Sequence, residues 1–404
     1  MNKRITFSEA GSGKGFLTLL AITGGMAAVG FLSFLFMEHS GHHVTGMNNQ
    51  IVWGLPHVFA IFMIVAASGA ANIGSVGTVF GKKIYQPLGR LSVITAISLL
   101  LGGLMVLVLD LGHPDRLIVA MTTFNFKSIF TWNILLYNGF LAIMGFYLWT
   151  MMDRSKLAKS LYKPAGYLAF LWRVILTAGT GSILGFLVAR QYYDAAIMAP
   201  LFITLSYVLG TAIYSLVLMA AYKWTGRDLG DAVLNRLRYT LAIFIAAVLF
   251  FEVIRHLTNL YATEHHGIEA FILRDGGIVT AIFWLGQILL GTLVPLFLIW
   301  CKKLRNNRKA LGAAAILAIL GGASLIYVVL IGGQSYPLVL FPNAEVTSTF
   351  FDGIVNSYSP SIYEFMLGIG GVGVALLVIV LAVKVLRLLP DSLADSVADP
   401  HHKS

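Results

Sequence analysis

Cysteine is nearly missing from this chain, whose 404 residues include only Cys301. Iron–sulfur clusters need several thiolates, and c-type haem needs a Cys-x-x-Cys-His motif, so this sequence can build neither group. A membrane b-type haem would need histidines on facing helices at mid-membrane depth. The histidines before the C-terminal tail lie near the ends of apolar runs instead. We therefore expect no haem and no iron–sulfur cluster within this chain.

Charge is also scarce, because charged residues make up 11% of the chain against about 25% in soluble globular domains. Hydrophobic residues make up 58%, in runs that reach the roughly 20 residues a helix needs to cross a bilayer. We expect an all-α integral membrane protein with ten transmembrane helices and no separate soluble domain. The first span lacks a small-residue cleavage site and should be retained. The expected spans are 16–37, 54–80, 88–110, 128–152, 167–190, 197–222, 236–260, 277–301, 310–332 and 361–387.

The basic residues alternate between the two ends of these spans. Of 28 Lys and Arg residues, 22 fall in the terminal segments and in every second loop, five fall in the other loops, and Arg173 lies inside a span. This positive-inside pattern predicts a multi-pass protein of the cytoplasmic (inner) membrane with both termini in the cytoplasm. It also accounts for the net charge of +10 without a nucleic-acid partner. The outward loops are then 38–53, 111–127, 191–196, 261–276 and 333–360.

One outward connection is rich in polar groups, in the stretch DLGHPDR at 110–116. Asp110 ends the third span, where an ionisable side chain is costly unless it is partnered or functional. The glycine and proline of this stretch should end the helix, and the turn then presents His113, Asp115 and Arg116. The simplest interpretation is a capped helix end with an Asp115–Arg116 ion pair.

Other polar and aromatic side chains are expected at the same depth, on the second and fourth spans. A quinone head group needs hydrogen-bond partners for its two oxygens and a route for protons. His or Tyr can bond an oxygen, and Asp or His can pass a proton. We therefore expect Asp110 and His113 to transfer protons. The expected quinone-binding residues are His57, Asp110, Asn125, Trp132 and Tyr137.

Two further patterns favour ordinary structural interpretations. Histidines gather at 39–43 and at 265–266, where a metal could bind, but solvated loop histidines are the simpler interpretation and we expect no metal site. The stretch GIGGVGV at 368–374 has the spacing of a dinucleotide-binding loop. It lies inside an apolar span with no preceding strand, so we expect helix packing through small residues.

Spans two and six suggest an internal repeat within a single membrane domain, 1–404. Each begins with a proline and carries small residues about three turns later, in LPHVFAIFMIVAASGAANI and APLFITLSYVLGTAIYSLV. We expect two four-helix bundles, spans 2–5 over 54–190 and spans 6–9 over 197–332, with span one and the last span, 361–387, outside them. The second unit shows no clear copy of the polar turn, so we place the quinone site in the first.

With these motifs the chain resembles the NrfD/PsrC family of membrane subunits of bacterial and archaeal oxidoreductase complexes. DLGHPDR and the following NFKSIFTW are similar to the family's Asp-Leu-Gly-x-Pro-x-Arg loop and Ser-x-x-x-Trp helix start. WLGQILLGTLVPLFL (284–298) and GGQSYPL (332–338) resemble its later segments. Ten spans with a long outward loop before the last are most similar to the DsrP type, which serves dissimilatory sulfite and sulfur metabolism. HybB-type members share much of this pattern.

The resemblance implies menaquinone or ubiquinone bound near the outer face. It also implies an iron–sulfur (ferredoxin-like) partner docked on that face, with other membrane and cytochrome subunits in the complex. The family's quinone positions correspond to the regions of His57 and Tyr137, and its motif Asp corresponds to Asp110. We expect a quinone-reactive subunit that is not a complete enzyme alone. The alternatives are a structural anchor, which needs no such polar set, and a secondary transporter, which should carry charge or broken helices at the midplane, where this sequence places little.

Overall fold

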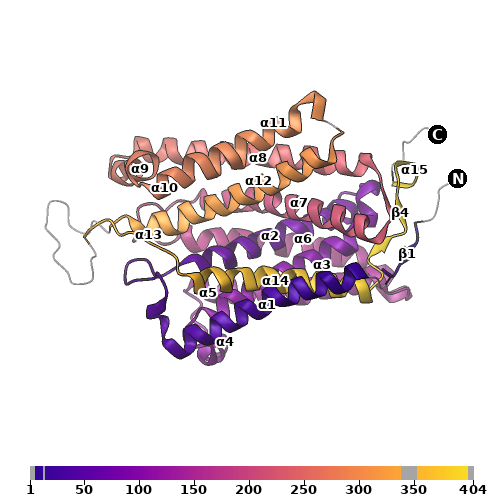
Figure 1. The fold of residues 1–404 in the computed structure, drawn as a ribbon, viewed down its shortest axis with the longest axis horizontal. Helices are drawn as coiled ribbons and strands as arrows, with labels where there is room; N and C mark the ends of the chain where they lie inside the picture. Colours follow the sequence, from indigo (N-terminus) through magenta and orange to yellow (C-terminus); the bar gives the residue numbers. More distant parts are fainter. Residues whose placement is uncertain (1–4, 12–13, 305, 338–352, 399–404) are drawn as a thin grey trace.

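Ten helices long and apolar enough to cross a membrane lie side by side in the computed structural model of this protein, which describes residues 5–11, 14–304, 306–337 and 353–398 (Figure 1). The first and last described elements, β1 and α15, lie at one end of the array, here termed the termini end. The short segments α4, α9 and α13 lie at the opposite end, here termed the site end. The expected all-α class and number of spans are confirmed.

Most spans are single α-helices, and three are composite. In the third span η2 leads into α3. In the eighth α10, η6 and α11 follow one another, and in the ninth α12 continues through η8 into α13. The single helices are α1 (Lys14–Ser40), α2 (Leu55–Thr78), α5 (Ile129–Met152), α6 (Lys156–Gly185), α7 (Met198–Thr225), α8 (Asp231–Tyr261) and α14 (Ile362–Val385). The composite ones are η2 (Lys83–Leu88) with α3 (Gly89–Leu109), α10 (Ile278–Ala281) with η6 (Ile282–Leu293) and α11 (Val294–Trp300), and α12 (Arg308–Tyr327) with η8 (Val328–Gly332) and α13 (Gly333–Ser335).

Short elements fill the connections. At the site end these are η1 (His42–Val44), η3 (Pro114–Arg116), α4 (Leu117–Thr122), η4 (Thr263–His265), α9 (His266–Ala270) and η5 (Phe271–Asp275). At the termini end, η7 (Lys302–Leu304) and α15 (Asp395–Ala398) accompany two small sheets. In these sheets β1 (Phe7–Ser8) pairs antiparallel with β3 (Leu389–Pro390), and β2 (Asp228–Leu229) pairs parallel with β4 (Ser392–Leu393).

The fifth span begins earlier than predicted, at Lys156 rather than near residue 167. The Ser155 hydroxyl caps it by accepting a hydrogen bond from the Ala158 N–H at 3.1 Å. Ala158 is buried while the lysines of these first turns are exposed, so the segment is an amphipathic extension of the span. The apolar run alone does not extend over these lysines, which is why a loop was expected there.

The helices pack in two groups and one pair. Contacts join α2, α3, α5 and α6 in the first group, and α7, α8, α12 and the eighth span in the second. Helices α1 and α14 pack against each other, and α14 also lies against α3. Because α2 also packs extensively on α7, the two groups share a continuous core. The division into units at 54–190, 197–332 and 361–387 stays a prediction.

Glycines allow the closest helix crossings. A Cβ atom at Gly69 of α2 would overlap the Ser206 carbonyl oxygen of α7, and one at Gly210 of α7 would overlap the backbone of Gly69. Gly30 of α1 lies against Gly370 of α14 in the same way, which confirms the packing function expected for GIGGVGV. Such small-residue contacts stabilise membrane helices by close packing, since lipid supplies little hydrophobic drive between them.

We predict that Gly69→Ala destabilises the protein although alanine favours helix. The methyl group has no room at the α2–α7 crossing, and overpacking of this kind costs about 1–3 kcal/mol. Gly145→Ala in α5 is the control, because nothing lies within 4 Å of its Cβ position. It should be neutral or stabilising by up to about 1 kcal/mol. Thermal unfolding in detergent measures both, and equal melting temperatures for the two variants would contradict the close crossing.

Candidate functional site

The polar turn after α3 is shaped by its backbone. Asp110 ends the helix, and its N–H donates to the Val106 carbonyl at 3.1 Å. Gly112 has φ +70°, a left-handed conformation that strains residues with a Cβ, so the glycine allows the chain to turn here. Pro114 then begins η3, and the chain continues as α4, where Ile118 and Val119 are exposed.

His57 and Asp110 meet at the site end of α2 and α3. The Nδ1 atom of His57 lies 2.9 Å from Oδ2 of Asp110. The Asp110 side chain has no exposed surface, and 17% of the His57 side chain is exposed. The two atoms are close but are not aligned as a hydrogen bond, and no group in the described part of the chain donates to either Asp110 oxygen. Asp110 is therefore a buried carboxyl with hydrogen-bonding capacity that a proton or a ligand can fill.

Aromatic rings form a wall beside this pair. The Trp53 ring stacks on His57 with 6.3 Å between ring centroids, and Phe130 meets Trp53 edge-on at 6.3 Å. Gln334 of α13 holds the backbone of Trp53 in place, because it accepts from the Trp53 N–H and donates to the Trp53 carbonyl, both at 3.0 Å. Tyr193 stacks on Trp53 at 6.4 Å. The GGQSYPL segment thus positions the wall of the site.

His42, which was expected to be a solvated loop histidine, is a further candidate residue of the site around Asp110. Its ring atoms Cδ2 and Nε2 lie 3.4 Å from the position of a Cβ on Gly112, so the ring packs on the turn two residues beyond Asp110. Its Nε2 atom is buried and has no hydrogen-bond partner among the residues described. Only the folding of the 38–53 loop back onto the turn reveals this proximity.

Tyr137 and Trp132, both on α5, make other contacts. Tyr137 is 7% exposed, and its hydroxyl lies 3.4 Å from that of Thr180 on α6. Trp132 is 48% exposed, and its indole N–H donates to the Phe126 carbonyl at 3.0 Å. Within the described chain neither side chain makes a hydrogen bond, ion pair or ring contact with His57 or Asp110.

Asn125 and His113 lie on exposed parts of the same connection. The Asn125 side chain accepts from the Lys127 N–H at 3.1 Å. The His113 side chain is 64% exposed and lies 3.7 Å from Asp115, so the expected Asp115–Arg116 ion pair is replaced by a contact with His113. Of the predicted quinone and proton residues that the structure describes, only His57 and Asp110 are joined to each other by an ion-pair contact.

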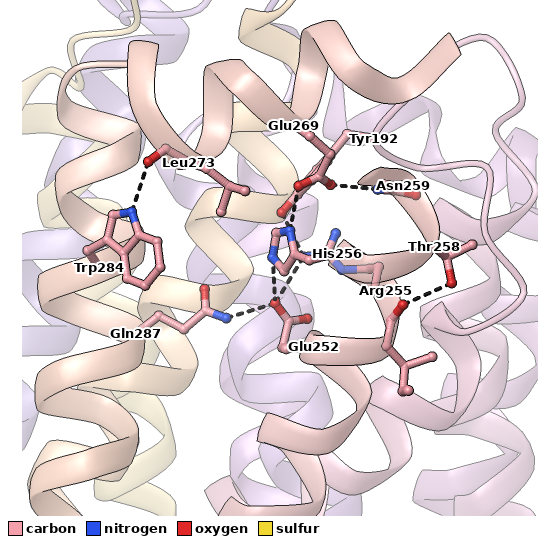
Figure 2. Close-up of polar contacts among 11 residues, drawn as sticks. Tyr192, Glu252, Arg255, His256, Thr258, Asn259, Glu269, Leu273, Trp284 and Gln287 are labelled. Atoms are coloured by element: carbon pink, nitrogen blue, oxygen red, sulfur yellow. Dashed lines mark hydrogen bonds and ion pairs between the residues drawn. The ribbon is translucent and has the colours of Figure 1, made fainter. Parts of the chain in front are cut away.

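A second set of buried ionisable groups lies between α8, α9 and η6 (Figure 2). We term it the α8 network and define it by Tyr192, Glu252, Arg255, His256, Asn259, Glu269 and Gln287. Arg255 donates to Glu252 at 3.0 Å and to the Tyr192 hydroxyl at 2.6 Å. Burial raises the pKa of Tyr192 above its ordinary value, so this phenol stays neutral.

Glu269 of α9 completes the network. It lies 2.7 Å from His256 Nδ1 and accepts from the Asn259 amide at 2.7 Å. Gln287 lies on η6, and its amide donates to Glu252 at 2.9 Å. The η6 segment is a π-helix, a form often found at functional positions.

This network lies in the second unit, where the sequence shows no clear copy of the polar turn. The sequence did contain a signal, because Glu252, Arg255, His256 and Asn259 are spaced i, i+3, i+4 and i+7 and share one helix face. The loop motifs alone did not indicate it.

Arg173, which the sequence places inside a span, is a charged side chain buried at membrane depth. Its side chain is 1% exposed and sits about 18 Å along α6 from the helix end at Gly185. It donates to Asn72 at 2.8 Å and to Tyr207 at 3.1 Å, and its guanidinium also lies over the Tyr207 ring. A lack of deep charge is therefore not an argument against a transporter.

The chemistry available at the His57–Asp110 pair is proton exchange beside an aromatic surface. A carboxylate and an imidazole in contact can hold a proton and pass it on, and the imidazole is partly exposed to an incoming reactant. No group of three or more His, Cys, Asp or Glu side chains in the described ranges is arranged to hold a metal ion.

Comparison with known proteins agrees with the motifs. Residues 43–337 match the family described as Polysulphide reductase, NrfD. The Hdr-like menaquinol oxidoreductase integral membrane subunit of Archaeoglobus fulgidus is 26% identical, with 95% of this chain and 96% of that protein covered. A selenate reductase subunit of Mesobacillus selenatarsenatis is 25% identical, with 89% and 91% covered. A putative dimethyl sulfoxide reductase membrane subunit of Halobacterium salinarum is 25% identical, with 96% of each covered. Since the family match spans well over half of the sequence, this chain is a multi-pass membrane protein that belongs to the NrfD family.

Proposed function

We propose that this chain is the quinone-reactive membrane subunit of a multi-subunit oxidoreductase complex, and that menaquinone or ubiquinone reacts beside His57 and Asp110. The observation that carries the proposal is the buried Asp110 carboxyl, 2.9 Å from His57, with no hydrogen-bond donor to either oxygen among the residues described. The name of one relative, a menaquinol oxidoreductase subunit, supports the same chemistry.

The residues around the pair fit a quinone head group. A bound quinone supplies two-electron, two-proton redox chemistry. His57 can donate a hydrogen bond to one of its oxygens, and Asp110 can accept a proton from a quinol hydroxyl. Trp53 and Phe130 offer ring faces against which a flat head group can pack.

Protons leaving the pair need a route to water. His42 packs on the turn beside Asp110, and His113 is exposed on that turn, so either imidazole can take a proton outward. Tyr137, on the family resemblance, and Asn125 and Trp132, on their expected depth, remain proposed quinone contacts, with ligand binding required to bring them to the pair.

The orientation we propose places the site end outside the cytoplasm. The support is the distribution of Lys and Arg, which favours the termini end by 22 to 5 and predicts cytoplasmic termini in an inner membrane. An iron–sulfur partner would then dock on the site end, using the loops 38–53, 111–127 and 333–360, although 338–352 lies outside the described residues. Cytochrome and further membrane subunits complete the proposed complex.

The terminal substrate is proposed on resemblance alone. Ten spans and the long last outward loop are similar to DsrP-type subunits of dissimilatory sulfite and sulfur metabolism. The names of the relatives point to selenate and dimethyl sulfoxide reduction as well, so they support a quinone-linked complex rather than one substrate.

We predict that Asp110→Asn slows quinol turnover by the assembled complex about 10²-fold or more, the scale of losing a general acid–base group. Asparagine keeps the shape of the side chain and removes its titration, so assembly should be unchanged. Asp115→Asn is the matched control, because that side chain is 75% exposed on the same turn. Turnover is measured with a quinol analogue. An Asp110→Asn complex that assembles and turns over normally would leave the chain as a structural anchor.

We predict that the natural Cys301, at the termini end, is protected from a membrane-impermeant maleimide in intact cells. Glu264→Cys, placed at the site end in a Cys301→Ser background, should be labelled without permeabilisation, because positive-inside topology puts that end outside. Labelling of Cys301 in intact cells, with protection of the cysteine at 264, would reverse the proposed orientation.

We predict that photo-crosslinkers at His43 and Asp115 capture an iron–sulfur protein in the intact complex, because both positions lie on exposed loops beside the pair. A crosslinker at Lys83, exposed at the termini end, is the control and should not capture it. Mass spectrometry identifies the product. Capture of the iron–sulfur protein from Lys83 alone would contradict docking on the site end.

A further inference from the structure

The α8 network gathers four ionisable side chains away from water. Glu252 is 2% exposed, Arg255 1%, His256 8% and Glu269 0%. Such groups are expensive to bury, and a network of them persists only if the charges nearly cancel and the hydrogen bonds are made. The proton content of the network therefore follows from its geometry.

His256 lies between the two carboxylates. Its Nδ1 atom is 2.7 Å from Oε2 of Glu269, and its Nε2 atom is 3.6 Å from Oε2 of Glu252, an ion-pair distance too long for a hydrogen bond. A neutral imidazole has one N–H and one lone pair, so one of the two carboxylates would face a lone pair. A protonated ring, or a protonated glutamate, removes this repulsion.

The net charge of the network also requires an additional proton. Two carboxylates and the Arg255 guanidinium leave one negative charge, and one additional proton makes the network neutral. Because the groups are coupled, the proton belongs to the network rather than to one residue. The other side chains that face it are uncharged: Tyr192 from the loop before α7, Asn259 on α8 and Gln287 on η6.

We propose that the α8 network is a proton-binding site in the second helix group, separate from the proposed quinone site, that holds one proton shared by His256, Glu252 and Glu269. The site exchanges with water at the site end, where 11% of the His256 side chain is exposed. The Oε1 atom of Glu252, the Nε2 atom of His256 and the Oε1 atom of Gln287 have no hydrogen-bond partner among the described residues, so the network retains positions for proton movement. A cavity of about 20 Å³ borders Gln287 and Thr292 and has room for one water molecule.

Infrared difference spectroscopy of the full chain in lipid nanodiscs tests this site without any quinone. In His256→Gln the remaining charges sum to one negative, so a buried glutamate should become protonated. A new carboxylic-acid C=O band, sensitive to deuterium exchange, should then appear at neutral pH. The band is new if the wild-type proton resides on His256, and is retained if it resides on a glutamate. Adding Glu269→Gln restores neutrality without that proton, and the band should vanish. Glu264→Gln, an exposed glutamate in η4, is the control and should leave the wild-type spectrum unchanged.

The wild-type protein provides a measurement that does not depend on the folding of variants. At neutral pH its spectra should contain a protonated imidazole of His256 or a protonated buried glutamate, assigned by isotope labelling of histidine or glutamate. Absence of both signals in the wild type would overturn the proposal, as would a folded His256→Gln variant without the acid band. Asp110→Asn should leave these bands unchanged, so failure of the quinone proposal and failure of this one are distinguishable.

Discussion

A charged side chain buried among membrane helices must have a partner, and this constraint explains where the polar residues of this protein lie. Asp110 lies against His57 at the end of α3. Glu252 and Arg255 are paired one helical turn apart on α8, and His256 lies against Glu269. Arg173 has no acid partner among the described residues; it donates to the Asn72 amide oxygen and the Tyr207 hydroxyl and lies over aromatic faces. In each case the partner comes from a different helix or from the next turn of the same helix. The pairs between different helices also fix how those helices pack.

The two polar centres are joined by two consecutive residues of a short loop. Tyr192 bonds Arg255 in the α8 network, and Tyr193 stacks on Trp53 at the wall of the proposed quinone site. Both phenols are buried, and burial raises the pKa of each, so they join the centres as neutral groups. Gln334 adds a second connection, because it extends from the ninth span to hold the backbone of Trp53. A late segment of the sequence thus positions an early one, and both centres contact the same pair of tyrosines.

The apolar runs of the sequence predicted the ten spans, because length and composition are sufficient to identify a membrane helix. The local motif at 110–116 predicted the helix end at Asp110 and the turn at Gly112. The approach of His57 to Asp110 was expected only as a shared depth on neighbouring spans. The packing of His42 on Gly112 depends on how a loop folds back, which no local pattern records. Glu269 reaches His256 from a separate short helix, so the helical spacing on α8, which the sequence analysis did not use, carries a signal for only half of that network, and tertiary packing supplies the rest.

The two centres differ in how completely they are satisfied, and this difference separates their proposed functions. In the His57–Asp110 pair both carboxylate oxygens lack a donor among the residues described, while the imidazole is partly exposed beside aromatic rings. The two Asp110 oxygens can therefore accept hydrogen bonds from an external molecule. In the α8 network each glutamate already accepts from neighbouring side chains and Arg255 bonds both Glu252 and Tyr192, while Glu252 Oε1 and His256 Nε2 lack a partner among the described residues. What such a densely bonded network can still exchange at low cost is a proton, because moving one changes the charge balance without moving a heavy atom.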